Sequence, residues 1–212
     1  MSAVVPDPAA TPSQTVHVVN IANGLTMLRM ALVPVFAVTL LYADGTDTRT
    51  RLLAAAIFTV AVVTDRFDGE IARKRGLITD FGKLADPIAD KALTGTALIG
   101  LSILAELPWW LTGVILAREI GVTLLRFWVI RHGVIPASRG GKLKTFTQAV
   151  AIGLYVLPLS GLLGTVRWWV MAVAFVLTVV TGVDYVARAI TLRRTSPRAI
   201  RQREARAARQ RG

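Results

Sequence analysis

Six long apolar stretches dominate the chain, and short polar segments separate them. Each stretch approaches the roughly 20 residues that an α-helix needs to cross about 30 Å of hydrocarbon. The stretches run over residues 25–42, 52–71, 88–104, 109–130, 146–163 and 168–192. The pattern predicts an all-α integral membrane protein, in which six transmembrane helices form one compact bundle over residues 20–192.

Composition supports this class and limits the chemistry. Hydrophobic residues make up 53% of the 212 residues and charged residues only 18%, whereas ordinary soluble domains carry about 25% charged residues. The sequence has no cysteine, which excludes disulfides and thiol chemistry. Its two histidines, His17 and His132, argue against a histidine base or a multi-histidine metal site.

The distribution of basic residues predicts the orientation. The net charge is +12, an excess that lipid-facing helix surfaces cannot carry. Most Lys and Arg residues outside the apolar stretches lie in the linkers 73–85 and 131–145 and in the tail 193–212. By the positive-inside rule these segments and both termini face the cytoplasm. The opposite ends of two spans carry the pairs expected in an outer aromatic belt, Trp109 with Trp110 and Trp168 with Trp169.

The two ends of the chain read as extensions of the bundle. Residues 1–19 are expected to be a disordered or juxtamembrane leader, because residues 1–15 lack the basic start of a signal peptide. The tail 193–212 carries eight Arg residues, which favours attraction to anionic membrane lipids. No aromatic residue is interleaved there for base stacking, so we expect no nucleic-acid partner.

Four carboxylates lie at the cytoplasmic ends of the second and third spans. At 100° per residue, Asp65 and Asp68 share one helix face, and Asp86 and Asp90 share another. A short linker makes the two helices antiparallel neighbours, so the acidic faces are expected to meet. Carboxylates this close repel each other unless cations intervene, and an all-oxygen ligand set favours Mg²⁺ or Mn²⁺.

A structural alternative exists for each of these residues. The carboxylates could form salt bridges with Arg66, Arg73, Lys83 and Lys91, or Asp86 could cap a helix that begins at Pro87. Four ionisable groups on facing helices at membrane depth favour a functional site instead. The small residues Gly69, Ala72 and Gly82 would leave room for an extended ligand beside them.

The same run of residues resembles a known family. It matches the pattern D-x2-D-G-x2-A-R-x8-G-x3-D-x3-D, the signature of the CDP-alcohol phosphatidyltransferases, while Arg66 and Glu70 occupy free positions of that pattern. The matching residues are Asp65, Asp68, Gly69, Ala72, Arg73, Gly82, Asp86 and Asp90. The resemblance implies an integral membrane fold of six helices.

The resemblance also implies a site. By carry-over, Asp65, Asp68 and Asp86 coordinate two Mg²⁺ or Mn²⁺ ions, and Asp90 is the general base. The CDP moiety would contact the residues Asp68, Gly69, Ala72, Arg73 and Gly82. Family members are commonly homodimers, so a second copy of the chain is an expected partner.

Basic residues further along are candidates for binding a phosphate on the acceptor. Arg118 and Arg126 lie eight residues apart on one helical sector, and Arg139, Lys142 and Lys144 follow in a linker. The alternatives are an Arg118–Glu119 ion pair and a purely topological role for the linker. Within the family, this stretch and residues 23–29 resemble the bacterial branch that uses glycerol 3-phosphate.

The implied reaction joins CDP-diacylglycerol and glycerol 3-phosphate to give phosphatidylglycerophosphate and CMP at the cytoplasmic face of a bacterial cell membrane. Alternative acceptors within the family are inositol phosphate and phosphatidylglycerol. A different class, a divalent-cation transporter, could also use an Asp cluster. Against transport, all four Asp lie at one membrane face, with no matching polar residues in the outer halves of the spans.

Overall fold

The computed structural model describes the backbone of residues 21–75, 80–129 and 139–195, and the side chains of residues 23–67, 85–125 and 140–192. This part of the chain contains no strand, which confirms the all-α class. Six α-helices and one short 3-10 helix account for it. They are α1 (Ile21–Leu41), η1 (Tyr42–Gly45), α2 (Thr48–Arg75), α3 (Asp80–Ile103), α4 (Trp109–Val129), α5 (Arg139–Val156) and α6 (Gly161–Thr195).

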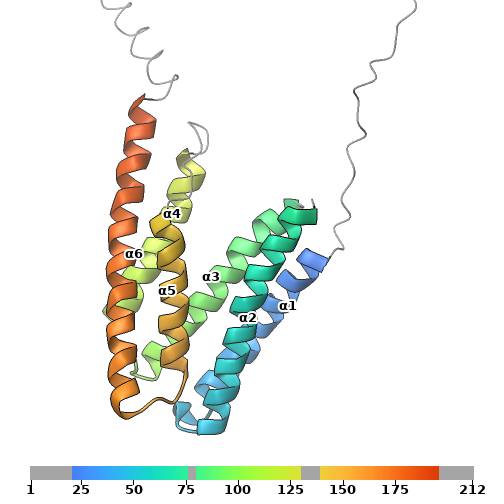
Figure 1. Cartoon of the computed structure of the whole chain (residues 1–212), viewed down its shortest axis with the longest axis vertical. Helices are drawn as coiled ribbons and strands as arrows, with labels where there is room; N and C mark the ends of the chain where they lie inside the picture. Colours follow the sequence, from blue (N-terminus) through green and yellow to red (C-terminus); the bar gives the residue numbers. More distant parts are fainter. Residues whose placement is uncertain (1–20, 76–79, 130–138, 196–212) are drawn as a thin grey trace, which may run out of the picture.

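The helices alternate in direction and form two groups (Figure 1). α1 packs against both α2 and α3, while α6 packs against α4 and α5. α3 runs obliquely between the groups and contacts α4 and α5, and α2 also contacts α5. The upper end of the molecule in Figure 1 holds the beginnings of α1, α3 and α5 and the ends of α2, α4 and α6. The lower end holds η1 and the short connections α3–α4 and α5–α6.

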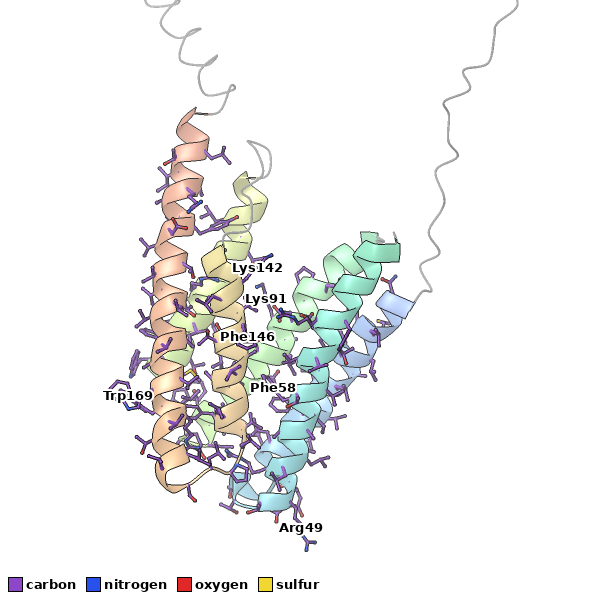
Figure 2. The ribbon with its side chains drawn as sticks, viewed as in Figure 1. Arg49, Phe58, Lys91, Lys142, Phe146 and Trp169 are labelled. Carbon is purple, nitrogen blue, oxygen red and sulfur yellow. The ribbon has the colours of Figure 1, made fainter. Side chains whose placement is uncertain are left out.

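The apolar core occupies the lower half of the bundle. Its fully buried side chains lie late in α1 and α3 and early in α4 and α6, as Leu40, Leu98, Ile115 and Met171 illustrate. The rings of Phe36 and Phe58 join α1 to α2, with centroids 5.6 Å apart. Phe58 is labelled in Figure 2. Close packing below leaves the upper half to the charged side chains described next.

Several helix boundaries differ from the predicted spans. α3 begins at Asp80 rather than at residue 88, and Pro87 lies inside it. Asp86 is therefore within a helix, and its reading as an N-cap is wrong. α5 covers Arg139–Val156 rather than residues 146–163, so part of the predicted linker 131–145 is helical. The apolar residues indicate only the part of a helix that would lie in hydrocarbon. The helix itself continues through polar turns until a residue such as Pro158 ends it.

Two helices in the described part of the chain are long and apolar enough to cross a membrane. The candidate spans are Asn23–Gly45 and Gly161–Leu192. Trp109, Trp110, Trp168 and Trp169 each expose more than half of their surface. All four lie toward the lower end, and Figure 2 shows Trp169 directed away from the bundle.

Candidate active site

The first helix gathers two carboxylates of the signature. Arg29 of α1 is fully buried and donates a hydrogen bond to Asp65 Oδ1 on α2. Thr26, also buried, donates a hydrogen bond of 2.5 Å to Asp86 Oδ1 on α3. Residues three apart in a helix share one face. Asp65 and Asp86 therefore lie against the same face of α1, which places the acidic parts of α2 and α3 together.

Asp90 lies one turn after Asp86 on α3 and belongs to the same group. It is close enough to Asp65, Arg29, Lys91 and Glu119 to interact with them electrostatically. The structure thus brings Asp65 and Asp86 to one face of α1 and leaves Asp90 one helical turn from Asp86. Asp65 lies ten residues before the end of α2, about 15 Å along the helix axis, so the group is well inside the upper half of the bundle.

The remaining signature residues are placed by their backbone alone. Asp68, Gly69, Ala72 and Arg73 lie in the last turns of α2, and Gly82 lies in the first turn of α3. Their side-chain surroundings lie outside the described residues. Among the described side chains, no group of three or more Asp, Glu, His or Cys residues is arranged to hold a metal ion. The side chain of Asp68 lies outside the described residues, so the predicted ligand set stays a prediction.

The donor chemistry of the group fits a hard divalent cation. Carboxylate oxygens are the ligands that Mg²⁺ and Mn²⁺ prefer. Asp65 keeps 43% of its side chain exposed although its partner Arg29 is buried, so a ligand can approach this carboxylate. Asp86 has a hydroxyl donor that orients it, as carboxylate ligands in metal sites commonly do.

A second charged cluster adjoins the carboxylates. We call it the Glu119 cluster: Lys91, Arg118, Glu119 and Lys144. Lys91 Nζ lies 3.3 Å from Glu119 Oε2, and Arg118 Nη1 lies 3.3 Å from Glu119 Oε1. Lys144 donates to the same Oε1. The four residues come from α3, α4 and α5, so this cluster links three helices.

The acceptor-phosphate candidates fall into three situations. Arg118 and Lys144 belong to the Glu119 cluster, where the Arg118–Glu119 ion pair considered as an alternative is present. Lys142 is exposed on the first turn of α5, near the level of Lys91 (Figure 2). Arg126 of α4 and Arg139, the first residue of α5, have side chains outside the described residues. A topological role for Lys142 stays possible beside a ligand-binding one.

Sequence reasoning did not assign roles to Thr26 and Arg29, and it treated Lys91 and Glu119 only as salt-bridge partners. One signal could have found Arg29, because it is the only charged residue in the sequence of α1. An ionisable group inside an apolar span usually faces a partner or a site. The Thr26 and Glu119 contacts depend on how the helices pack, which local sequence does not show.

The described residues thus form a helical bundle in which carboxylates of α2 and α3 lie against α1. Residues 19–180 match the family model described as CDP-alcohol phosphatidyltransferase. The chain belongs to this family, which confirms the resemblance seen in its signature. Membership of a transferase family decides against the cation transporter.

Three proteins with similar sequences carry more specific names. A "Probable phosphatidylglycerophosphate synthase" from Mycobacterium tuberculosis strain H37Rv is 62% identical over 174 residues, covering 82% of this chain and 83% of that protein. A "CDP-diacylglycerol--glycerol-3-phosphate 3-phosphatidyltransferase" from Rickettsia bellii is 41% identical over 177 residues, covering 78% and 93%. A Bacillus subtilis protein of the same name is 36% identical over 182 residues, covering 80% and 94%.

Proposed function

We propose that this chain transfers the phosphatidyl group of CDP-diacylglycerol to glycerol 3-phosphate, which gives phosphatidylglycerophosphate and CMP. The observation that carries the proposal is that Asp65 of α2 and Asp86 of α3 both accept hydrogen bonds from one face of α1, with Asp90 one turn after Asp86. The family match over residues 19–180 supports the reaction type. The names of the relatives support glycerol 3-phosphate as the acceptor.

The proposed setting is a bacterial cell membrane that the chain crosses six times, with both termini and the site at the cytoplasmic face. Two helices that meet the criteria of a membrane span support a location in a membrane. Among the described residues, Arg73, Arg139 and Arg193 belong to helix ends at the upper end, and the exposed Trp pairs lie toward the lower end, as the positive-inside rule and an outer aromatic belt require. Association into a homodimer is part of the same proposal.

Asp65, Asp68 and Asp86 would hold two divalent cations, Mg²⁺ or Mn²⁺. When bound, such ions neutralise charge on the attacking and leaving oxygens of a phosphoryl transfer. Thr26 and Arg29 orient Asp86 and Asp65 for this role. The small residues Gly69, Ala72 and Gly82 leave space for the CDP moiety, which Asp68 and Arg73 would also contact.

Asp90 is the proposed base. It accepts the proton of the acceptor hydroxyl while the hydroxyl oxygen forms a bond to the phosphorus that carries diacylglycerol. The bond between this phosphorus and the bridging oxygen breaks, and CMP leaves with that oxygen. Positioned general bases of this kind contribute about 10²- to 10⁴-fold to rate.

Cations near Asp90 are proposed to bind the phosphate of the acceptor. Lys144 is 4% exposed and Arg118 is largely buried, so their hydrogen bonds to an anion would be poorly screened. Arg126, Arg139 and Lys142 complete the proposed set from α4 and the first turn of α5. Replacing one of these five residues by Gln should raise the KM for glycerol 3-phosphate about 10- to 150-fold, the equivalent of about 1.5–3 kcal/mol.

The deciding experiment is metal-dependent release of CMP from CDP-diacylglycerol by the purified protein, with a panel of acceptors. Glycerol 3-phosphate should support release of CMP, and free glycerol should not. In a pocket built for phosphate, the cations stay unpaired when the acceptor has no phosphate. Inositol phosphate and phosphatidylglycerol complete the panel. Efficient turnover with either of these, and none with glycerol 3-phosphate, would assign another acceptor. If Gln substitutions at all five positions left the acceptor KM within twofold, the phosphate pocket would be wrong.

A further inference from the structure

The Glu119 cluster has an unusual balance of charge. One carboxylate contacts three cations, Lys91, Arg118 and Lys144, so the four residues together carry +2. The side chain of Glu119 is 16% exposed and that of Lys144 only 5%. Three cations at such close range repel each other strongly where water is scarce. Glu119 is the group that holds them together.

The excess charge matches a particular ligand. A phosphate monoester carries about −1.5 to −2 charges at pH 7, so its arrival would bring the cluster close to neutrality with Glu119 still in place. Each lysine donates one hydrogen bond to Glu119 among the described residues, and an ammonium group carries three N–H donors. Arg118 Nε has no hydrogen-bond partner in the described part of the chain but lies against α6 at Gly182, so Arg118 would reach a phosphate through its terminal nitrogens.

The sixth helix fixes the direction of Arg118. Arg118 Nη2 donates to Thr181 Oγ1 at 2.9 Å. Gly182 lies against the same side chain, since a Cβ built there would be 3.0 Å from Arg118 Cγ. With α6 behind it, Arg118 directs Nη1 at Glu119. The cluster therefore comes from three helices, α3 to α5, and α6 packs against it at Thr181 and Gly182.

The cluster also adjoins the proposed base. Lys91 directly follows Asp90 in α3, and Asp90 interacts electrostatically with both Glu119 and Lys144. A phosphate on these cations would place the rest of a small acceptor next to Asp90. This arrangement suits an acceptor whose reacting hydroxyl is a few bonds from its phosphate.

We infer that Glu119 is a positioning residue for the acceptor, which gathers Lys91, Arg118 and Lys144 into one phosphate-binding group, and that Lys91 is a further phosphate donor. The inference rests on the proposed function and deepens it. Glu119 acts through the cations and does not itself touch the phosphate. Without its charge, the cations separate and the bound phosphate loses their combined hydrogen bonds.

The test is steady-state kinetics of Glu119→Gln in the full chain. The KM for glycerol 3-phosphate should rise about tenfold or more, whereas the KM for CDP-diacylglycerol should stay within twofold of the parent. Inorganic phosphate is used as a competitive inhibitor, and its inhibition constant should rise in parallel with the acceptor KM. Glu119→Asp keeps the charge one methylene shorter and should recover part of the loss. Lys91→Met should also raise the acceptor KM about tenfold.

Glu106 offers a matched control. It also bridges two cations, Arg51 and Arg167, but at the lower end of the bundle. Glu106→Gln should leave both KM values within twofold of the parent. This control distinguishes the specific effect of Glu119→Gln from a general effect of losing a bridging glutamate. The double variant Glu119→Gln with Lys91→Met should lose less than the product of the single losses, because both act on one binding group.

The inference is overturned if the parent converts glycerol 3-phosphate while Glu119→Gln and Lys91→Met leave its KM within twofold. If Glu119→Gln does not accumulate, Glu119→Asp and Lys91→Met decide by the same criterion. A parent protein that uses only a phosphate-free acceptor would instead contradict the proposed function itself. The acceptor panel on the parent and the kinetics of the variants therefore report the two failures separately.

Discussion

Two buried arginines, one in each half of the bundle, show how the same side chain serves different purposes. Arg29 in the upper half is fully buried and pairs with the partly exposed carboxylate of Asp65. Arg51 at the lower end is 2% exposed and donates to the backbone carbonyls of Val156 and Tyr155, at 2.9 and 2.6 Å. One partner is a side chain that a ligand can approach, and the other is the end of a helix.

The partners of Arg51 explain its structural role. The last carbonyls of an α-helix lack intrahelical donors, and α5 ends at Val156 just before Pro158. Arg51 supplies those donors from α2, and Glu106 joins it to Arg167 of α6 at 3.4 and 2.9 Å. Arg167 also lies over the Tyr155 ring, 4.8 Å from its centroid. The lower end is thus a fixed joint, whereas the upper end holds carboxylates and cations, among them the partly exposed Asp65.

The largest expected effect is a loss of kcat when Asp90, at the upper end, is replaced. Asp90→Asn keeps the side-chain volume but cannot accept a proton, so kcat should fall about 10²- to 10⁴-fold while the KM for CDP-diacylglycerol changes little. CMP release measures both parameters. Asp44→Asn, an exposed carboxyl variant in η1 at the lower end, is the matched control and should retain parental turnover. Near-parental turnover of Asp90→Asn would remove Asp90 from the role of base.

The next prediction concerns the fixed joint. Arg51→Met leaves two buried carbonyls without these donors and removes a partner of Glu106, so the protein should lose about 3–5 kcal/mol of stability. A thermal unfolding curve in detergent should shift to lower temperature, with kcat and both KM values of the folded fraction unchanged. Arg49→Met, two residues away and exposed (Figure 2), should not shift the curve. Lower kcat in folded Arg51→Met would break the division between the two ends.

A smaller effect is expected when the hydroxyl that orients Asp86 is removed. Thr26→Val removes the hydroxyl that orients Asp86 but keeps the shape, so the metal concentration required for half-maximal activity should rise about 10- to 100-fold. Thr39 of the same helix donates only to α1 carbonyls, at 2.9 and 3.0 Å from Val35 O and Phe36 O. Thr39→Val is therefore the control. Overlapping metal titrations of the two variants would contradict the positioning role of α1.

The smallest effect is expected for an exposed ion pair on α6. Arg188 Nε lies 2.9 Å from Asp184 Oδ2, and both side chains are about half exposed. Pairs four residues apart on a helix surface contribute about 0.3–0.5 kcal/mol. Asp184→Asn should therefore leave the thermal midpoint and the kinetics nearly unchanged. A large loss would show that α6 has a charged partner at this position.

Much of the architecture could be predicted from the sequence because it follows from local patterns. Apolar stretches of membrane length predicted six helices, and six α-helices occur in the described part of the chain. The eight-position signature resembles that of the family, and the family match confirms it. Its spacing also places carboxylates on single helix faces. Helix ends were less accurate. The first turns of α3 and α5 are polar, and a hydropathy pattern cannot distinguish a polar turn from a linker.

The sequence by itself determined that the protein is helical, apolar, basic in two linkers and in its C-terminal tail, and equipped with four carboxylates at a set spacing. Only the tertiary structure decided which side chains meet them. The short linker between α2 and α3 suggested that their acidic faces contact each other, yet α1 supplies the groups that touch Asp65 and Asp86. Likewise, Lys91, Glu119 and Lys144 are far apart in the chain and meet because three helices pack together. Helix periodicity is a property of neighbouring residues, whereas such long-range contacts depend on how whole helices cross.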